Sequence, residues 1–351
     1  MSPLLSVVIP AYNRADLLRL CLASVRRAGC GLDYEIVLVD DGSPAPLAGQ
    51  LVGVDDLPLR VVQQPNTGLI GAKNRGLAEA RGQFVQFLDS DDLVAPGKFN
   101  AQLRALEETS ADVAYCDQGC IDLAAVGTGP EMPPVFDAEP LAATDDSTSF
   151  YLEIQPAPHS PLFRTDYLRA QLRSPLVPPS PIFNPVGEVW MYFNLCPQPA
   201  RIVRTPGVFA LIGVHAQERI TNHWEKQAVA VAALMHLFQC ACPLTPETRR
   251  VRQLVGQRAF LAWRALPRGF PRAIARATLE RWQYAPPGPR RALGGPLFRA
   301  LAAGLGPVMA GRLLRQWQRP AYGKVRTLPP ATLAAACARA EEEVPGLFTH
   351  A

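Results

Sequence analysis

The strongest constraint on the fold of this chain is a series of short apolar segments separated by helix-like patterns. Five segments have the length of strands, at residues 4–10, 34–39, 59–64, 84–88 and 112–116. Between them, apolar residues recur at helical spacing in residues 17–25, 71–81 and 96–108. Strands that are buried on both faces and alternate with helices form a parallel, doubly wound sheet. The sequence therefore predicts an α/β fold, with a mostly parallel sheet covered by helices on both faces.

Local signals mark the ends of these helices. Asn13 precedes the first helical pattern and can cap it, while Gly29 follows it as a stop signal. The pattern at 96–108 opens with Pro96, which is favoured in the first turn of a helix.

Polar side chains gather where the predicted strands end. Asn13 follows the first strand, Asp40 and Asp41 follow the second, and Asp89 and Asp91 follow the fourth. In open parallel sheets, ligands bind beyond the carboxyl ends of the strands. Neighbouring carboxylates repel one another, so the acidic stretch after the fourth strand is either a cation site or merely a polar turn.

The second half of the chain has a different character. Residues 124–186 are rich in proline and predict irregular structure, whereas helices are expected at 226–239, 247–266, 269–283 and 297–317. Residues 225–351 hold 19 Lys and Arg against 6 Asp and Glu, a net charge of +13. Residues 1–224 hold 16 against 25, a net charge of −9. This asymmetry predicts two regions with different tasks.

Four motifs carry a resemblance to a known family. They read SVVIPAYNR, IVLVDDGS, PNTGLIGAKNRG and FVQFLDSDD, in that order along residues 6–92. In this order and at this spacing they resemble the nucleotide-sugar-binding half of a family 2 glycosyltransferase of the GT-A fold. The match is strong over residues 4–122, weak to about 222, and says little about the rest. It implies a catalytic domain at 1–223, with a donor half at 1–122 and an acceptor half at 123–223, followed by a basic helical region at 224–351.

The resemblance assigns residues to a nucleotide-diphosphate sugar, expected to be UDP-linked. It places the nucleoside against the first turn and the base against Asp41, which could otherwise form only an Asx turn. Lys73 suits the diphosphate or the base edge, or it is a solvated helix charge. The nucleotide-sugar contacts implied in this way are Pro10, Ala11, Tyr12, Asn13, Asp41, Asn66, Gly68, Lys73, Asn74, Asp89 and Ser90.

Asp89-Ser90-Asp91 matches the D-x-D metal motif of the family. Hard oxygen ligands suit Mg²⁺ or Mn²⁺, which also bridges phosphate oxygens. The resemblance implies Asp89 and Asp91 as metal ligands, with His215 as a third ligand or a diphosphate contact. A lone histidine can equally be structural. Asp92 is expected to support the following turn instead of binding metal.

The catalytic base is where the sequence departs from the family. An inverting transfer by single displacement needs a group that takes the proton of the acceptor hydroxyl. The family supplies a Glu-Asp pair at the start of a helix, but here Glu188 is followed by Val189. Glu188 is the preferred base. The alternatives are another carboxylate, among Glu153, Asp166 and Glu218, or a protein that binds the nucleotide sugar without transferring it.

The basic tail suggests a surface for anionic lipids. In residues 249–326 arginines alternate with apolar residues, and Arg299, Arg312, Arg315 and Arg319 flank a broad apolar side. The alternative is a solvated helical cap on the catalytic unit, and nucleic acid is not expected as a partner.

These observations predict a cytoplasmic enzyme, attached peripherally at the inner face of the membrane, whose acceptor is a carbohydrate or a lipid-linked molecule. The chain lacks an uninterrupted run of about 18 apolar residues, so no membrane-spanning helix is expected. The start of the sequence has no secretory signal pattern.

Overall fold

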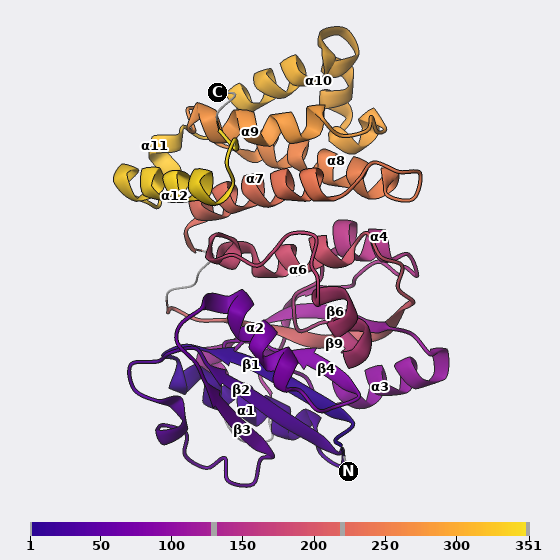
Figure 1. Cartoon of the computed structure of the whole chain (residues 1–351), viewed down its shortest axis with the longest axis vertical. Coiled ribbons are helices and arrows are strands. Elements are labelled where there is room, and N and C mark those ends of the chain that lie inside the picture. Colours follow the sequence, from indigo (N-terminus) through magenta and orange to yellow (C-terminus); the bar gives the residue numbers. More distant parts are fainter. Residues whose placement is uncertain (1, 128–131, 218–221, 349–351) are drawn as a thin grey trace. The chain divides into compact units, whose positions relative to one another are not determined.

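The structure is a computed structural model that describes residues 2–127, 132–217 and 222–348. By their contacts the residues form two compact units. One comprises Met1–Pro175 with Asn194–Gln217, and the other comprises Leu176–Phe193 with Glu218–Ala351. The first unit contains the sheet, and the second unit is helical (Figure 1).

Within the described residues the sheet has nine strands, which run in the order β3-β2-β1-β4-β8-β6-β9-β5, with β7 beside β6. The strands are β1 (Leu5–Ala11), β2 (Tyr34–Asp40), β3 (Leu59–Gln63), β4 (Phe84–Phe87), β5 (Leu93–Val94), β6 (Val113–Asp122), β7 (Phe136–Glu139), β8 (Leu162–Arg164) and β9 (Ile202–Val214). Strands β3, β2, β1 and β4 are parallel, and β6 and β9 form a second parallel pair. The five predicted strands and the mostly parallel sheet are confirmed.

Helices cover both faces of this sheet, as predicted. Successive side chains of a strand point to opposite faces. Leu5, Val7 and Ile9 of β1 share one hydrophobic core with residues of α1 (Ala15–Ala28) and α3 (Lys98–Thr109). Val8 faces the other side and meets α2 (Gly68–Glu79), where a Cβ on Gly76 would lie only 2.2 Å from Val8 Cγ1. Glycine therefore lets α2 approach the sheet closely.

Three predicted helix starts need correction. Helix α1 begins at Ala15, and Asn13 does not cap it: Asn13 has a φ of 50°, and Arg14 occupies the cap position without a side-chain hydrogen bond. Helix α2 begins at Gly68, three residues earlier than predicted. Helix α3 begins after Gly97, which has a φ of 84°, so Pro96 lies outside the helix. The stop signal at Gly29 is confirmed.

Residues 124–186 are more regular than predicted, because they supply β7, β8 and several helices. Strand β8 lies antiparallel between β4 and β6 and joins the two parallel parts of the sheet. The helical elements are α4 (Ser147–Ser149), the π-helix η3 (Phe150–Ile154), α5 (Thr165–Leu172) and the 3-10 helix η4 (Pro181–Val186). The prediction of irregular chain therefore holds only in part, because short elements interrupt it, and Pro181 and Pro185 lie inside η4.

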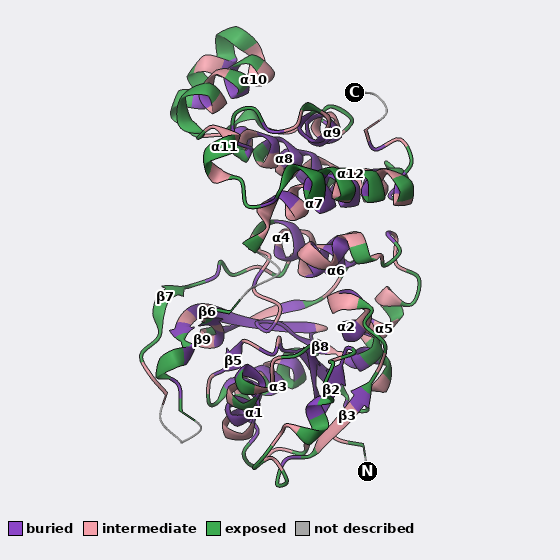
Figure 2. Ribbon diagram, turned by 90° about the vertical axis from the view of Figure 1, so that its left-hand side faces the viewer, coloured by how far each residue is buried: buried purple, intermediate pink, exposed green. Residues whose placement is uncertain are grey.

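The second unit has its own core. Its helices are α6 (Gly187–Leu195), α7 (Trp224–Ala241), α8 (Arg249–Ala265), α9 (Arg272–Gln283), α10 (Pro296–Gln318), α11 (Tyr322–Val325) and α12 (Pro330–Glu343). The predicted helices of this region are therefore confirmed. Phe260 packs its ring against Trp263, Trp282 and Phe298, with the Trp282 ring centroid 4.6 Å away. In Figure 2, α7 to α9 turn buried residues toward one another, whereas α10 is mostly exposed.

Helix α10 is the one described helix that is long and apolar enough to cross a membrane by length and composition. The sequence did not predict such a helix, because charged residues interrupt its apolar runs. Its backbone is broken at Gly306, where φ is 76° and Pro307 follows. The two parts have about 10 and 12 residues, or about 15 and 18 Å of helix, and a hydrocarbon core is about 30 Å thick. As folded here, neither part is long enough to span a bilayer.

Candidate active site

The first wall of the candidate site is the turn after β1. Pro10 and Ala11 end the strand, and Tyr12 follows with 47% of its surface exposed. Asn13, in the left-handed region, donates its backbone N–H to Ser43 Oγ at 2.9 Å. The turn after β1 is thereby tied to the turn after β2, and Tyr12 is left open to solvent.

The two aspartates after β2 have different roles. Asp40 is buried and accepts from the N–H groups of Ser43 and Leu47, at 3.0 and 2.9 Å, so it holds the turn. Asp41 reaches across to the start of α2, where Oδ1 accepts from the N–H of Thr67 at 2.9 Å and Oδ2 from that of Gly68 at 2.8 Å. Asp41 therefore fixes the beginning of α2 in this structure.

A pocket of about 330 Å³ opens between the turn after β2 and the loop after β3. It is lined by Asp40, Gly42, Ser43, Pro46, Gln63, Gln64 and Pro65. A Cβ on Gly42 would lie 2.7 Å from the backbone nitrogen of Asn66, so glycine permits the two loops to meet. The volume lies at the lower end of the range for small-molecule sites. The pocket lies beyond the carboxyl ends of β2 and β3, next in sequence to Asp41 and Asn66, but the residues predicted to contact the nucleoside do not line it.

Helix α2 and the residue Asn66 before it contribute further predicted donor contacts. Asn66 is exposed before the helix, Gly68 opens it with a φ of 79°, and Asn74 is half-buried within it. Lys73 is buried, and its ammonium lies 2.9 Å from Asp89 Oδ1. The interpretation of Lys73 as a solvated helix charge was wrong, because its amine points at the turn Asp89–Asp92, called the aspartate turn below.

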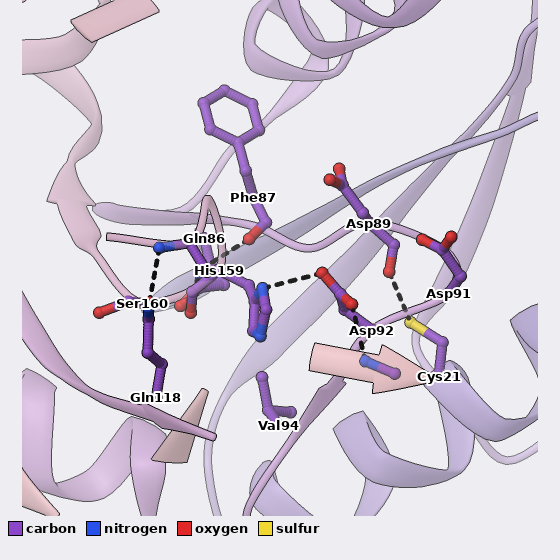
Figure 3. A network of polar contacts seen from close by, with 12 residues as sticks. Cys21, Gln86, Phe87, Asp89, Asp91, Asp92, Val94, Gln118, His159 and Ser160 are labelled. Atoms are coloured by element: carbon purple, nitrogen blue, oxygen red, sulfur yellow. Dashed lines mark hydrogen bonds and ion pairs between the residues drawn. The ribbon is translucent and has the colours of Figure 1, made fainter. Parts of the chain in front are cut away.

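The aspartate turn after β4 collects groups from three distant parts of the chain. Asp91 Oδ2 accepts from Arg14 Nη1 at 2.6 Å and lies 3.1 Å from His215 Nε2 at the end of β9. Ser90 is buried between the two aspartates. Cys21 Sγ lies 3.7 Å from the carbonyl oxygen of Asp89 (Figure 3). Burial raises the pKa of the Cys21 thiol, and the charges of Asp92, Asp91 and Asp89 raise that pKa further.

The pair formed by Asp91 and His215 fits a divalent cation. Among the described residues no cluster of three or more His, Cys, Asp and Glu side chains forms a site made of protein ligands alone. Mg²⁺ usually takes one or two carboxylates and fills its other positions with phosphate oxygens and water. Asp91 Oδ2 and His215 Nε2 lie 3.1 Å apart, within hydrogen-bond distance of one another, and a carboxylate oxygen and an imidazole nitrogen are both groups that divalent ions bind.

Arg14 is the residue of this site that the sequence did not reveal. Its side chain is only 22% exposed, and its guanidinium binds the carboxylate oxygen of Asp91 that also faces His215. Arg14 belongs to the first of the four motifs, but an arginine at the start of a helix is ordinarily a surface charge. Only the fold brings it to Asp91, 77 positions later.

Asp92 supports the turn, as expected. Its Oδ1 accepts from the N–H of Gly213 at 3.0 Å, and its Oδ2 lies 3.1 Å from Nδ1 of the buried His159. Both contacts hold the turn against other parts of the sheet.

Glu188 belongs to the second unit. It lies in the first turn of α6 and is half-buried, so the predicted helix start is confirmed. Trp190 is buried and donates Nε1–H to the carbonyl of Val177 at 3.0 Å, which gives it a core role. Glu218 lies outside the described residues.

Of the other alternative bases, Asp166 lies at the end of the sheet where β4 starts, away from the aspartate turn. Its neighbour Thr165 donates its N–H to Gln83 before the start of β4, whereas the aspartate turn follows the end of that strand. Glu153 lies on η3, with Ser149 Oγ 2.5 Å from its Oε2. Asp166 is therefore set aside, and Glu153 stays an alternative to Glu188.

Comparison with known proteins identifies the domain that holds this site. Residues 6–166 match the family model described as glycosyl transferase family 2. The chain contains a domain of this family. The matched region includes both turns of the pocket, Lys73, Arg14 and the aspartate turn, whereas His215 and Glu188 lie beyond it.

Relatives of the family 2 domain are similar over part of their length. The chain is 34% identical over 119 residues to the uncharacterized glycosyltransferase EpsJ of Bacillus subtilis, covering 33% of this chain and 34% of EpsJ. It is 37% identical over 135 residues to the succinoglycan biosynthesis protein ExoW of Rhizobium meliloti, covering 34% of this chain and 42% of ExoW. The match therefore spans about a third to two fifths of these relatives.

Solved structures resemble the chain over more of its length. TarS 1–349 of S. aureus in complex with UDP-GlcNAc has a TM-score of 0.61 at 16% identity, covering 93% of each chain. The mannosyltransferase PcManGT of Pyrobaculum calidifontis, in complex with GDP-Man and Mn²⁺, has a TM-score of 0.53 at 16% identity, covering 98% of this chain and 88% of that one. At this identity the likeness establishes the fold, which is of the GT-A type with a helical C-terminal region.

Proposed function

We propose that this chain is a metal-dependent glycosyltransferase that moves a sugar from a nucleotide-diphosphate donor, UDP-linked, to a hydroxyl of a carbohydrate or lipid-linked acceptor. The observation that carries the proposal is the aspartate turn of the family 2 domain. There Asp91 and His215 lie 3.1 Å apart, with the cationic groups of Arg14 and Lys73 on the same turn.

The residues of the site divide the work of holding the donor. In the proposal the nucleoside lies in the pocket beside Asp41, with Tyr12 against it. The diphosphate lies toward Lys73 and Arg14, which then exchange part of their contact with the aspartates for phosphate oxygens. Asp91 and His215, with Asp89 nearby, would hold Mg²⁺ or Mn²⁺. The ion would supply positive charge that stabilises the departing diphosphate.

For the transfer itself, Glu188 is the proposed base. A carboxylate that accepts the proton of the acceptor hydroxyl makes that oxygen a better nucleophile toward the anomeric carbon, and a single displacement inverts the configuration there. The competing proposal is a protein of the same fold that binds the donor without transfer, and the specific observation in its favour is Val189 in place of an aspartate.

A screen of nucleotide sugars tests the proposed function. With Mn²⁺ present, we expect the wild-type protein to release free nucleoside diphosphate from one UDP-sugar faster than from GDP- or dTDP-linked donors. Measurement of released diphosphate, with water as the acceptor, avoids the need to know the natural acceptor. Absence of turnover with every donor, together with tight UDP binding, would favour the non-catalytic protein.

We further propose that the protein works in the cytoplasm and associates with anionic membranes through α10. The exposed apolar side chains of this helix are Leu297, Leu305, Met309 and Trp317. Arg299, Arg312 and Arg319 are exposed near them, which suits anionic headgroups. The sequence analysis wrongly placed Arg315 on this surface. Its guanidinium packs over Trp263 at 5.2 Å and donates hydrogen bonds to the carbonyls of Leu266 and Pro267.

Replacing Trp317, which is 71% exposed, by serine tests this surface. Burying a large apolar side chain contributes about 1.5–3 kcal/mol, so the variant should bind phosphatidylglycerol vesicles roughly tenfold more weakly in cosedimentation. Val52→Ser is the matched control, since Val52 is 77% exposed in the first unit and should leave binding unchanged. Equal binding by wild type and Trp317→Ser would contradict the membrane proposal.

A further inference from the structure

The aspartate turn and His215 are held together by the pairing of two strands. Strand β5 begins directly after the turn and pairs antiparallel with β9, with Leu93 opposite Leu211 and Val94 opposite Ala210. Continuing this register brings Gly213 opposite Asp91. A Cβ on Gly213 would lie 2.1 Å from the carbonyl oxygen of Asp91, so a larger residue would push the strand and the turn apart.

Asp92 holds this close approach with both of its oxygens. Oδ1 accepts from the Gly213 N–H at 3.0 Å, and Oδ2 lies 3.1 Å from Nδ1 of His159 (Figure 3). His159 is completely buried and Asp92 is 8% exposed, so water does not weaken these contacts much. The carboxylate next to Asp91 in sequence is thus hydrogen-bonded to Gly213 on one side and faces the buried ring of His159 on the other.

The loop that carries His159 is itself fixed by buried polar side chains. Gln86 donates Nε2–H to the carbonyls of His159 and Pro161, at 3.2 and 3.1 Å. Ser160, between them, accepts at its carbonyl from Gln102 at 2.8 Å and from Lys98 at 3.3 Å. Three consecutive carbonyls are therefore held by β4 and α3. Burial lowers the pKa of Lys98 to about 8.

We propose that His159 and Asp92 are positioning residues: together with Gly213 they set the separation of Asp91 and His215, and thereby the affinity of the site for a divalent ion with a nucleoside diphosphate. This inference rests on the proposed function. Asp91 and His215 are 124 positions apart in the sequence. The hydrogen bond that links their two segments joins Asp92, which follows Asp91, to Gly213, which lies two residues before His215. Groups that orient ligands in this way typically change metal affinity by about 10–100-fold when they are removed.

A purely structural role for His159 makes a different prediction. It would lower the melting temperature on substitution but leave the affinity of the folded protein for Mn²⁺ and UDP unchanged. Affinity and stability must therefore be measured together.

His159→Leu is the principal variant, because leucine fills the buried space but has no ring nitrogen to face Asp92. We expect calorimetric affinity for UDP in the presence of Mn²⁺ to fall at least about tenfold, with little change in affinity for UDP without metal. His159→Asn, whose amide N–H can take the place of Nδ1, should recover most of the loss.

Thr165→Val is the matched control for stability. Thr165 is buried and donates Oγ1–H to the Gly82 carbonyl at 2.7 Å, but it lies near the start of β4, whereas the aspartate turn follows the end of that strand. This variant should lower the melting temperature while binding UDP and Mn²⁺ like the wild type.

Gly213→Ala provides a second route if His159→Leu does not fold, and it should also weaken Mn²⁺-dependent UDP binding. Wild-type affinity in folded His159→Leu, or in folded Gly213→Ala, would overturn the positioning role while leaving the proposed function intact. A wild-type protein with no Mn²⁺-dependent affinity for UDP would instead overturn the proposed function and the positioning role with it.

Discussion

Replacing Asp91 by asparagine is expected to lower kcat/KM for the donor by at least about 100-fold, the scale seen when charge stabilisation of a leaving group is lost. Asparagine keeps the shape of the side chain but removes the negative charge that Arg14 and His215 share. The loss should persist at high Mn²⁺ because an amide oxygen is a much weaker ligand than a carboxylate oxygen. Initial rates of diphosphate release over a series of Mn²⁺ concentrations measure the effect.

Asp16→Asn is the control for this substitution. Asp16 lies in the first turn of α1 with its side chain 85% exposed, so the variant also loses one carboxylate close in sequence to Arg14. It should retain the activity of the wild type. If Asp91→Asn were as active as Asp16→Asn, the turn would be an acidic loop without a role in the chemistry.

Glu188→Gln has the second large expected effect. General-base catalysis contributes about 10²–10⁴-fold, so kcat should fall within that range. The affinity for UDP should stay the same, because the proposed donor contacts lie on β1, β2, α2, β4 and β9. Single-turnover rates with a saturating UDP-sugar, together with a calorimetric UDP titration, separate the two quantities.

Glu153→Gln is the companion variant, since Glu153 is the described alternative base that the fold leaves open. A fall in kcat for Glu153→Gln but not for Glu188→Gln would identify Glu153 on η3 as the catalytic base. Undiminished turnover in both variants would exclude both residues. Donor binding without turnover in the wild type would favour the non-catalytic protein that Val189 suggests.

Much of the first half of the fold could be predicted because its strands are local apolar runs. Strands β1, β2 and β4 are buried almost throughout, so their sequences are almost continuously apolar and bounded by turn residues, whereas β3 is mostly half-buried. Strand β9 could not be found in this way. Arg204, Pro206 and Gly207 interrupt its pattern, and its pairing with β6 shifts register near Asp117. Strand β8 is only three residues long and follows a proline-rich stretch.

The predicted start of α1 was wrong for a related reason. Asn13 has the right residue type for a cap, but the turn after β1 uses it in a left-handed conformation bonded to Ser43. A contact 30 positions away therefore overrides the local capping preference.

The candidate site was predictable to the extent that it lies at strand ends. Carboxyl ends of parallel strands share one edge, which brings the turns after β1, β2 and β4 together. Arg14 and His159 were missed because each acts through a partner more than 60 positions away, and neither residue type is distinctive where it stands. Glu188 fitted its predicted helix, while its catalytic role stays a proposal.

The most direct test of the central claim is a calorimetric titration of UDP into wild type and Asp91→Ala, each with Mn²⁺ and with a chelator. We expect the wild type to bind UDP at least about tenfold more tightly with Mn²⁺ than with the chelator, and Asp91→Ala to show no such difference. Equal, chelator-insensitive affinity in both proteins would contradict a divalent ion held by Asp91 and His215 against a diphosphate.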